Sequence, residues 1–300
     1  MQLVSSKNHQ GQATFLLVLA TGIWGFTFVT NQSLLTSISA IDIMTWRFGI
    51  AALVLVALRP SALKTLNRSE WIQGAVLGTL LALGYLAQLV GLKSTTATAS
   101  GFITGLFVIF TPMLSSAIFR QRISKLAWVA TMLTTVGLGL LALKGWTVGH
   151  GDLLTLACAF FFACHIIGLG HWSKTHLVYA LTTVQIGVVF LLSLAVSVWQ
   201  GGPARHNTAA NWRDLIFLAV FATCLCFFSQ TWAQSKLSTT RTGIILTLEP
   251  VFSGVAGVTI AHDQLSVRMI LGAGLILSAM YLVELDPTAR KASMTIHLEP

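Results

Sequence analysis

Ten long apolar runs with almost no charge occupy this sequence from residue 14 to residue 285, and they limit the fold more than any motif does. The runs span residues 14–36, 41–58, 71–91, 96–118, 125–143, 152–170, 179–199, 213–233, 240–261 and 267–285. Each is long enough to cross a hydrocarbon core of about 30 Å as a helix that rises about 1.5 Å per residue. Because lipid offers the backbone no hydrogen-bond partners, we expect an all-α integral membrane protein of ten transmembrane helices.

The composition supports a membrane location for nearly the whole chain. Of the 300 residues 55% are hydrophobic and 9% are charged, against about 25% charged in an average soluble domain. The short links leave no segment large enough for a separate soluble domain, and no A-x-A cleavage site follows the first apolar run. We therefore expect the first helix to be retained and the function to lie within the bilayer.

The basic residues predict the orientation of the chain. The net charge is +9, but the Lys and Arg residues are spread over the links and form no patch for nucleic acid. With the N-terminus inside, twelve of them fall on the cytoplasmic side, five on the other side, and only Arg47 within a run. This positive-inside bias predicts cytoplasmic N- and C-termini in a bacterial inner membrane.

The sequence also matches itself. A shift of 142 positions aligns residues 98–124 with residues 240–266, with identities that include Thr98/Thr240, Gly101/Gly243 and Leu106/Leu248. Pro112 and Pro250, the two prolines inside apolar runs, then fall four residues apart in equivalent helices. An internal proline removes a backbone hydrogen bond, so we expect both to kink their helices.

Five spans in each half would make the two halves enter the membrane from opposite sides. We therefore expect two inverted five-helix repeats, at residues 14–143 and 152–286. Such repeats are related by a pseudo-two-fold axis in the membrane plane, and they suit a central site that opens to either face in turn.

Four segments carry a resemblance to a known family. They are "ATGIWGFTFV" in the first run, "MTWRFGIAAL" in the second, "TTATASGFITGLFVIFTP" before and in the fourth, and "TTRTGIILTLEPVFSGVAG" in the ninth. Over about residues 14–286 the chain resembles the drug/metabolite transporter superfamily, in particular its ten-helix members with two EamA-type repeats. Those members usually carry a Gly-Glu-Arg-Leu-like sequence after helices 4 and 9, where this chain has "RQRIS" and "HDQLS".

The resemblance implies a small-metabolite substrate, such as an amino acid, often exported, although some relatives take up cofactors. It also implies a central cavity formed mainly by helices 3, 4, 8 and 9, with helices 1, 2, 6 and 7 around it. The direction of transport, the coupling ion and the oligomeric state stay open.

Arg47 and Glu249 are the two strong charges well inside the runs. An ionisable group at such depth is normally turned to the bundle interior or to water. Their expected depths differ by about 8 Å at about 1.5 Å per residue, so an ion pair between them is stretched but reachable. Arg47 could instead hold helix carbonyls or bind substrate. Glu249 could exchange protons, contact a substrate ammonium, or have a purely structural role.

Polar and aromatic residues on several helices are candidates for the substrate site. Tyr85 and Gln88 share one helix face, as do Phe227, Gln230 and Gln234, because their spacings are three and four. Buried amides need partners, which another helix or a substrate could supply. We expect these residues, with Trp24 and Asn31, to line a cavity for a zwitterionic or aromatic molecule.

Other chemistries find little support in the sequence. His165 could be a pH-sensitive member of the site or a structural residue. Cys158, Cys164, Cys224 and Cys226 all lie in runs and are expected to be packing residues. We expect no catalytic residue, metal, cofactor or obligate protein partner, since phosphate loops, nucleophile motifs and facing acid–base groups are absent.

The sequence therefore predicts a secondary transporter in contact with the lipid bilayer. The expected activity is export of amino acids or related amines by alternating access, with proton coupling left open. The alternative is an uptake carrier for a cofactor or a nucleotide-type metabolite. An intramembrane enzyme would need paired groups that the runs do not offer, and a sensor would need an output domain.

Overall fold

The computed structural model describes residues 2–118, 125–144, 147–173, 178–203, 208–237, 242 and 245–284. The helices of the first half are α1 (Gln2–Leu34), α2 (Ala40–Leu58), η1 (Pro60–Thr65), α3 (Arg68–Leu92), α4 (Ala97–Thr104), α5 (Phe107–Ile118) and α6 (Lys125–Ala142). A two-residue hairpin of β1 (Leu143–Lys144) and β2 (Thr147–Val148) follows. The second half has α7 (His150–Trp172), α8 (Val178–Trp199), α9 (Ala209–Phe217), η2 (Leu218–Leu225), α10 (Cys226–Gln234), α12 (Leu248–Thr259) and α13 (Val267–Glu284).

The helices follow the ten apolar runs closely. Within the described residues, seven helices are long and apolar enough to cross a membrane, and they coincide with seven of the ten runs. Runs five and ten correspond to the shorter helices α6 and α13. In run nine, α12 covers residues 248–259, while residues 240–241 and 243–244 lie outside the described part. The prediction of a helical multi-pass membrane protein is confirmed; the number ten is not.

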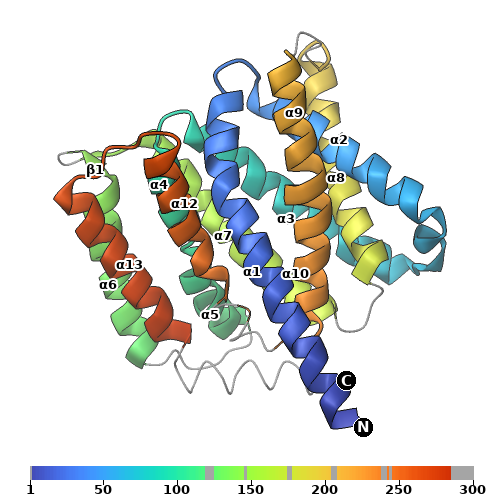
Figure 1. The fold of residues 1–300 in the computed structure, drawn as a ribbon, viewed down its shortest axis with the longest axis horizontal. Coiled ribbons are helices and arrows are strands. Elements are labelled where there is room, and N and C mark those ends of the chain that lie inside the picture. Colours follow the sequence, from blue (N-terminus) through green and yellow to red (C-terminus); the bar gives the residue numbers. More distant parts are fainter. Residues whose placement is uncertain are drawn as a thin grey trace.

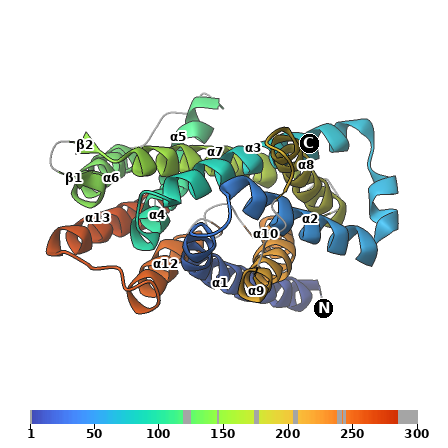
Figure 2. The same cartoon turned by 90° about the horizontal axis from the view of Figure 1, so that it is seen from above.

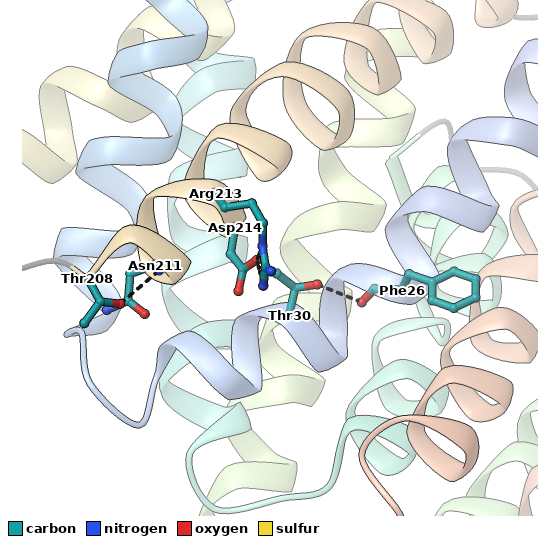
Figure 3. A network of polar contacts seen from close by, with 6 residues as sticks. All are labelled: Phe26, Thr30, Thr208, Asn211, Arg213 and Asp214. Atoms are coloured by element: carbon teal, nitrogen blue, oxygen red, sulfur yellow. Dashed lines mark hydrogen bonds and ion pairs between the residues drawn. The ribbon is translucent and has the colours of Figure 1, made fainter.

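Polar residues at the links fix where the helices begin. The side chains of Ser39, Thr96 and Thr208 each accept a hydrogen bond from a backbone amide in the first turn of α2, α4 and α9. Asn67 and Glu70 form a reciprocal capping box at the start of α3. Figure 3 shows the cap at Thr208 and, one turn further, the exposed ion pair of Arg213 with Asp214 at 2.9 Å.

The helices form an elongated bundle. Helices α6 and α13 pack together at one end, and α2 packs on α8 at the other (Figures 1 and 2). Between them α1 lies against α12 and α10, and α3 lies against α7 and α8. Large apolar side chains such as Leu53 and Val267 are exposed on the outside. An apolar outer surface is what a lipid-facing protein requires.

Two helices are interrupted at equivalent places in the two halves. Between α4 and α5 the chain makes a turn at residues 105–106, and just before α12 it makes a turn at Thr247, which the shift of 142 pairs with Gly105. Pro112 lies inside α5, and Pro250 lies in the first turn of α12, where a missing amide hydrogen is tolerated. The interruptions therefore precede the prolines rather than coinciding with them.

Helices α4 and α12 pack closely where α4 begins, and we call this contact the α4–α12 closure. A Cβ atom on Gly101 would collide with the side chain of Ser253, so only glycine allows this approach. Ser253 Oγ donates a hydrogen bond of 3.0 Å to the carbonyl of Ala97. The carboxylate of Asp263 accepts from the backbone amide and the hydroxyl of Thr98 at 2.9 and 2.7 Å. An anion at a helix N-terminus is favoured by the helix dipole.

Candidate functional site

A narrow cavity, here called the central cavity, lies between α1, α3, α5, α7, α10 and α12. Its rings are Trp24, Phe28, Tyr85, Phe107, Phe162 and Phe227. Its polar side chains are Thr27, Gln88, His165, Gln230 and Glu249, and Leu81, Ile166 and Leu246 complete the lining. The volume of the cavity that is open to water-sized groups is about 40 Å³. That is room for a few water molecules but too little for a metabolite.

The lining residues come from equivalent positions of the two halves. The shift of 142 pairs Tyr85 with Phe227 and Gln88 with Gln230, and all four line the cavity. The same shift pairs Phe107 with Glu249 and Trp24 with Ile166, which also line it. The central cavity is therefore built from matching helix faces of the two halves.

The aromatic side chains hold one another in fixed positions. The Phe227 ring lies 5.4 Å from Trp24 and 6.2 Å from Tyr85, measured between centroids. Tyr85 also contacts Phe162 edge-on at 5.3 Å. Edge-on and tilted ring pairs of this kind stabilise by about 0.5–1.5 kcal/mol beyond burial. The cavity wall is accordingly formed by mutually packed aromatic rings.

Glu249 is the acidic residue among the described lining residues. It lies in the first turn of α12, directly after the helix interruption, and is 7% exposed. Within the described residues its carboxylate makes no hydrogen bond or ion pair. Gln230, one helix away, is 4% exposed, and its Oε1 has no hydrogen-bond partner either. Two buried acceptor groups at the cavity thus lack protein donors.

His165 is held by a neighbouring amide. Its Nε2 lies 2.7 Å from Oε1 of Gln185 on α8, and Gln185 Nε2 donates to the carbonyl of Leu181. Because an amide oxygen only accepts, Nε2 of the imidazole is the donor in this contact. His165 is therefore a cavity residue whose orientation is fixed by Gln185.

Arg47 lies behind the cavity wall and is 1% exposed. Its Nε donates to Thr223 Oγ1 at 2.8 Å, its Nη2 donates to Tyr85 Oη at 3.3 Å, and its guanidinium lies 4.7 Å from the centroid of the Tyr85 ring. Its Nη1 is buried without a hydrogen-bond partner. The described side chains show no ion pair between Arg47 and Glu249.

The π-helical segment η2 explains how Arg47 is held. In this segment the carbonyl of Ala222 accepts from Trp24 Nε1 at 2.9 Å and from Arg47 Nη2 at 3.5 Å. The hydroxyl of Thr223 in turn donates to the carbonyl of Leu218, five residues earlier. A π-helix changes the register of the backbone and offers carbonyls to side chains from other helices. One irregular segment thus fixes both Trp24 and Arg47.

The structure separates the predicted site residues into two groups. Trp24, Tyr85, Gln88, Phe227, Gln230 and Glu249 meet at the central cavity. Asn31 and Gln234 are buried elsewhere: Gln234 Nε2 donates to the carbonyl of Ile166, and Asn31 Oδ1 has no partner. Within the described part of the chain, no three His, Cys, Asp or Glu side chains come close enough to hold a metal ion.

Sequence reasoning missed several residues that shape the site. Thr223 and Gln185 carry no distinctive pattern, because only the packing of η2 and α8 brings them to Arg47 and His165. Asp263 did have a signal: with His262 it stands where similar proteins carry Gly-Glu. His262 has φ of 56°, a left-handed conformation that favours glycine, and Asp263 caps α4. Asp263 therefore joins the second half to the first through its contact with Thr98.

Comparison with known proteins agrees with this architecture. A solved crystal structure superposes with a TM-score of 0.66 over 91% of this chain and 96% of that chain, at 15% identity, and so shares the fold. An uncharacterized transporter of Archaeoglobus fulgidus is 33% identical over 270 residues, 90% of this chain and 84% of its own length.

Two more distant relatives have named substrates. The threonine/homoserine exporter RhtA of Escherichia coli (strain K12) is 26% identical, with 88% of each chain covered. A biotin transporter of Salmonella typhimurium is 23% identical, with 89% of this chain and 91% of the relative covered.

The family itself is shown by a match to the EamA-like transporter family at residues 12–143 and again at residues 149–285. This confirms the resemblance found in the sequence and makes the protein a transporter rather than an intramembrane enzyme. Two matches to one family model agree with the equivalent positions seen in the cavity lining. The chain belongs to the EamA-like transporter family.

Proposed function

We propose that this protein is a secondary transporter that exports amino acids or related amines across the bacterial inner membrane by alternating access. The observation that carries the proposal is the central cavity, where equivalent faces of two halves enclose aromatic rings, two amides and one carboxylate. Few polar groups on a mostly apolar wall are typical of small-molecule sites. The similarity to the exporter RhtA supports the direction and the substrate class.

The interruptions of α4–α5 and before α12 would provide the movement. Because the cavity has only about 40 Å³ for water-sized groups, a substrate can enter only if helices move apart. Broken helices at membrane depth bend at the break with little loss of packing elsewhere. We propose that the halves rock about these breaks, opening the cavity at one end as the other end closes.

The proposed orientation follows from the distribution of basic residues. With both termini in the cytoplasm, the end at which α3 and α12 finish, and where Asp263 contacts Thr98, faces the outside. The α4–α12 closure would then be the outer gate. A transporter without an ATP site needs an ion gradient or a substrate gradient, and Glu249 is the group we propose to exchange a proton during the cycle.

A second candidate is uptake of a cofactor. The similarity to a biotin transporter, with 91% of that relative covered, favours it. Biotin carries one carboxylate and no ammonium group, so it would leave Glu249 without a cationic partner. Glu249, the acidic group among the described lining residues, therefore favours the amine-bearing substrates.

Counterflow in proteoliposomes tests the proposal. Purified protein is reconstituted, the vesicles are loaded with unlabelled L-threonine, L-homoserine, L-leucine or L-phenylalanine, and uptake of the labelled compound is measured. Accumulation above that of empty liposomes supports amino-acid transport. Accumulation of labelled biotin with no accumulation of any amino acid would replace the first candidate with the second.

Direction is tested in cells. A strain that overproduces the protein is grown on toxic amino-acid analogues beside a strain with the empty vector. Export predicts resistance, because the internal concentration of the analogue falls. Hypersensitivity would show import and contradict the proposed direction.

A further inference from the structure

Two pairs of equivalent residues that both line the central cavity differ in a hydroxyl or a carboxyl group. At one pair of equivalent positions the first half has Tyr85 and the second has Phe227, a difference of one hydroxyl. At another pair the first half has the phenyl ring of Phe107 and the second has the carboxyl group of Glu249. The amides match, because Gln88 and Gln230 are paired. These two pairs place a hydroxyl on one half and a carboxylate on the other, in a lining whose further polar side chains include Thr27 and His165.

The Tyr85 hydroxyl lies next to the buried cation Arg47. Its oxygen accepts a hydrogen bond from Arg47 Nη2 at 3.3 Å, and the guanidinium lies over the same ring. Within the described residues no acceptor takes the hydrogen of this hydroxyl. A hydroxyl that accepts from a cation becomes a stronger donor. Tyr85 thus carries the effect of Arg47 to a cavity that Arg47 does not itself line.

Among the described residues, Arg47 itself has an uncompensated positive charge near the Tyr85 hydroxyl. Its Nη1 is fully buried and unpartnered, which is costly for a cationic donor. The other hydrogen bonds of the guanidinium go to neutral oxygens, so they do not neutralise its positive charge. An anionic ligand group placed at the Tyr85 hydroxyl would supply the missing negative charge nearby.

The opposite side of the cavity offers acceptors. Glu249 lines the cavity, and among the described residues no donor bonds to its carboxylate. Gln230 lines it too, and its Oε1 has no hydrogen-bond partner. Arg47 contacts Tyr85 directly, and Tyr85 and Glu249 line the same cavity. Opposite charges are therefore present near one small cavity, but they do not neutralise each other in a direct ion pair.

We infer that the site selects zwitterions: the ligand α-carboxylate accepts from the Tyr85 hydroxyl, which Arg47 positions, and the ligand α-ammonium donates to Glu249. The ligand side chain then lies against Trp24 and Phe227. This inference rests on the proposed transport of amino acids and narrows it, because amines without a carboxylate and acids without an amine each leave one side unpaired. Tyr85 and Glu249 are the residues that determine specificity, and Arg47 is a positioning residue.

The test uses sets of compounds that differ by one charged group. Each amino acid is compared with the amine that lacks its carboxylate and the acid that lacks its amino group: L-phenylalanine with phenethylamine and hydrocinnamate, L-leucine with isoamylamine and isocaproate, and L-threonine with aminopropanol and hydroxybutyrate. Binding to the purified full-length protein in lipid nanodiscs is followed by thermal stabilisation, because a ligand of the folded state raises the unfolding temperature. We expect at least one amino acid to bind about tenfold more tightly than its amine and its acid.

Two variants separate the two ends of the ligand. Tyr85→Phe, which gives the first half the residue of the second, should weaken binding of that amino acid about tenfold and leave its amine unchanged. Glu249→Gln should weaken binding of the amino acid and of the amine, and it should leave binding of the acid unchanged. The control is Tyr179→Phe, since Tyr179 donates its hydroxyl hydrogen to the carbonyl of Leu55 and does not line the cavity.

The outcomes distinguish this inference from the proposed function. If the amines bind as tightly as the amino acids, or Tyr85→Phe weakens both equally, selection of zwitterions is wrong while amine transport stands. If no amino acid and no amine binds or exchanges in counterflow, the proposed function fails, and the inference fails with it. Unchanged selectivity in the Tyr179→Phe control is required in either case.

Discussion

Tyr85 and Phe227 occupy equivalent positions of the two halves, and their rings meet in the central cavity with centroids 6.2 Å apart and planes inclined by 66°. Two aromatic side chains thus form a shared frame around a pseudo-symmetric centre. The hydroxyl that distinguishes them is bonded to Arg47, the cation buried behind the wall. The central cavity and the α4–α12 closure lead to expected effects for four substitutions.

Replacing Glu249 with Gln should slow transport without loss of stability. Within the described residues no cation pairs with this carboxylate, so the change removes a buried charge and leaves no other charge unpaired. We expect transport to fall at least about tenfold and its pH dependence to flatten, while the unfolding temperature stays the same or rises. Counterflow at several pH values and thermal unfolding in detergent measure both.

The control for this variant is Asp214→Asn, which removes one charge from the exposed Arg213–Asp214 pair outside the cavity. It should change neither quantity. Full transport with unchanged pH dependence in Glu249→Gln would show that the carboxylate is structural.

Replacing Arg47 with Met should destabilise the protein. The variant loses charge-assisted hydrogen bonds to Thr223 and Tyr85, and we expect a loss of about 2–3 kcal/mol in the free energy of unfolding. Lys should not rescue it, because an ammonium cannot reproduce the planar fork of the guanidinium. Thr223→Val should lose about 1 kcal/mol, and the double variant should lose less than the sum because the two residues share one bond.

Chemical denaturation in detergent micelles measures these differences. Thr79→Val is the matched control, because the exposed Thr79 hydroxyl donates only to the carbonyl of Ala75 in its own helix. Equal losses in the free energy of unfolding for Thr79→Val and Thr223→Val would show that the bond from Arg47 to Thr223 does not stabilise the protein.

Replacing Asp263 with Asn should loosen the α4–α12 closure. The charged acceptor for the amide and the hydroxyl of Thr98 is lost, and with it a contact worth about 1.5–3 kcal/mol. The open form at this end should therefore become at least about tenfold more populated. The rate at which a thiol reagent modifies Ser253→Cys, in a background without the four native cysteines, reports the opening. An unchanged rate would show that Asp263 does not hold the closure.

Replacing Gly101 with Ala should act through packing alone. A Cβ atom at this position would overlap Ser253, so closing would require the helices to separate. Overpacking of this kind destabilises by about 1–3 kcal/mol, and we expect slower transport as well. Gly187→Ala is the control, because no atom lies within 4 Å of a Cβ there. Similar unfolding temperatures and transport rates for the two variants would disprove the close contact.

Much of the cavity lining could be predicted, because helical spacing determines which residues share a face. Tyr85 with Gln88, and Phe227 with Gln230, share faces at spacings of three, and both faces point to the cavity. Asn31 and Gln234 show the limit of that reasoning, since each lies about one turn beyond the last lining residue of its helix. Their burial elsewhere depends on the tilt of α1 and α10, which periodicity does not encode.

The sequence by itself determined the helical membrane architecture, the family and the equivalence of the two halves, because these depend on the length, charge and repetition of apolar runs. Only the tertiary structure decided the partners of the buried charges. A stretched ion pair of Arg47 with Glu249 was compatible with the sequence, yet Arg47 is bonded to Thr223 and Tyr85. That choice depends on the π-helical register of η2, which is set by contacts among helices far apart in the chain.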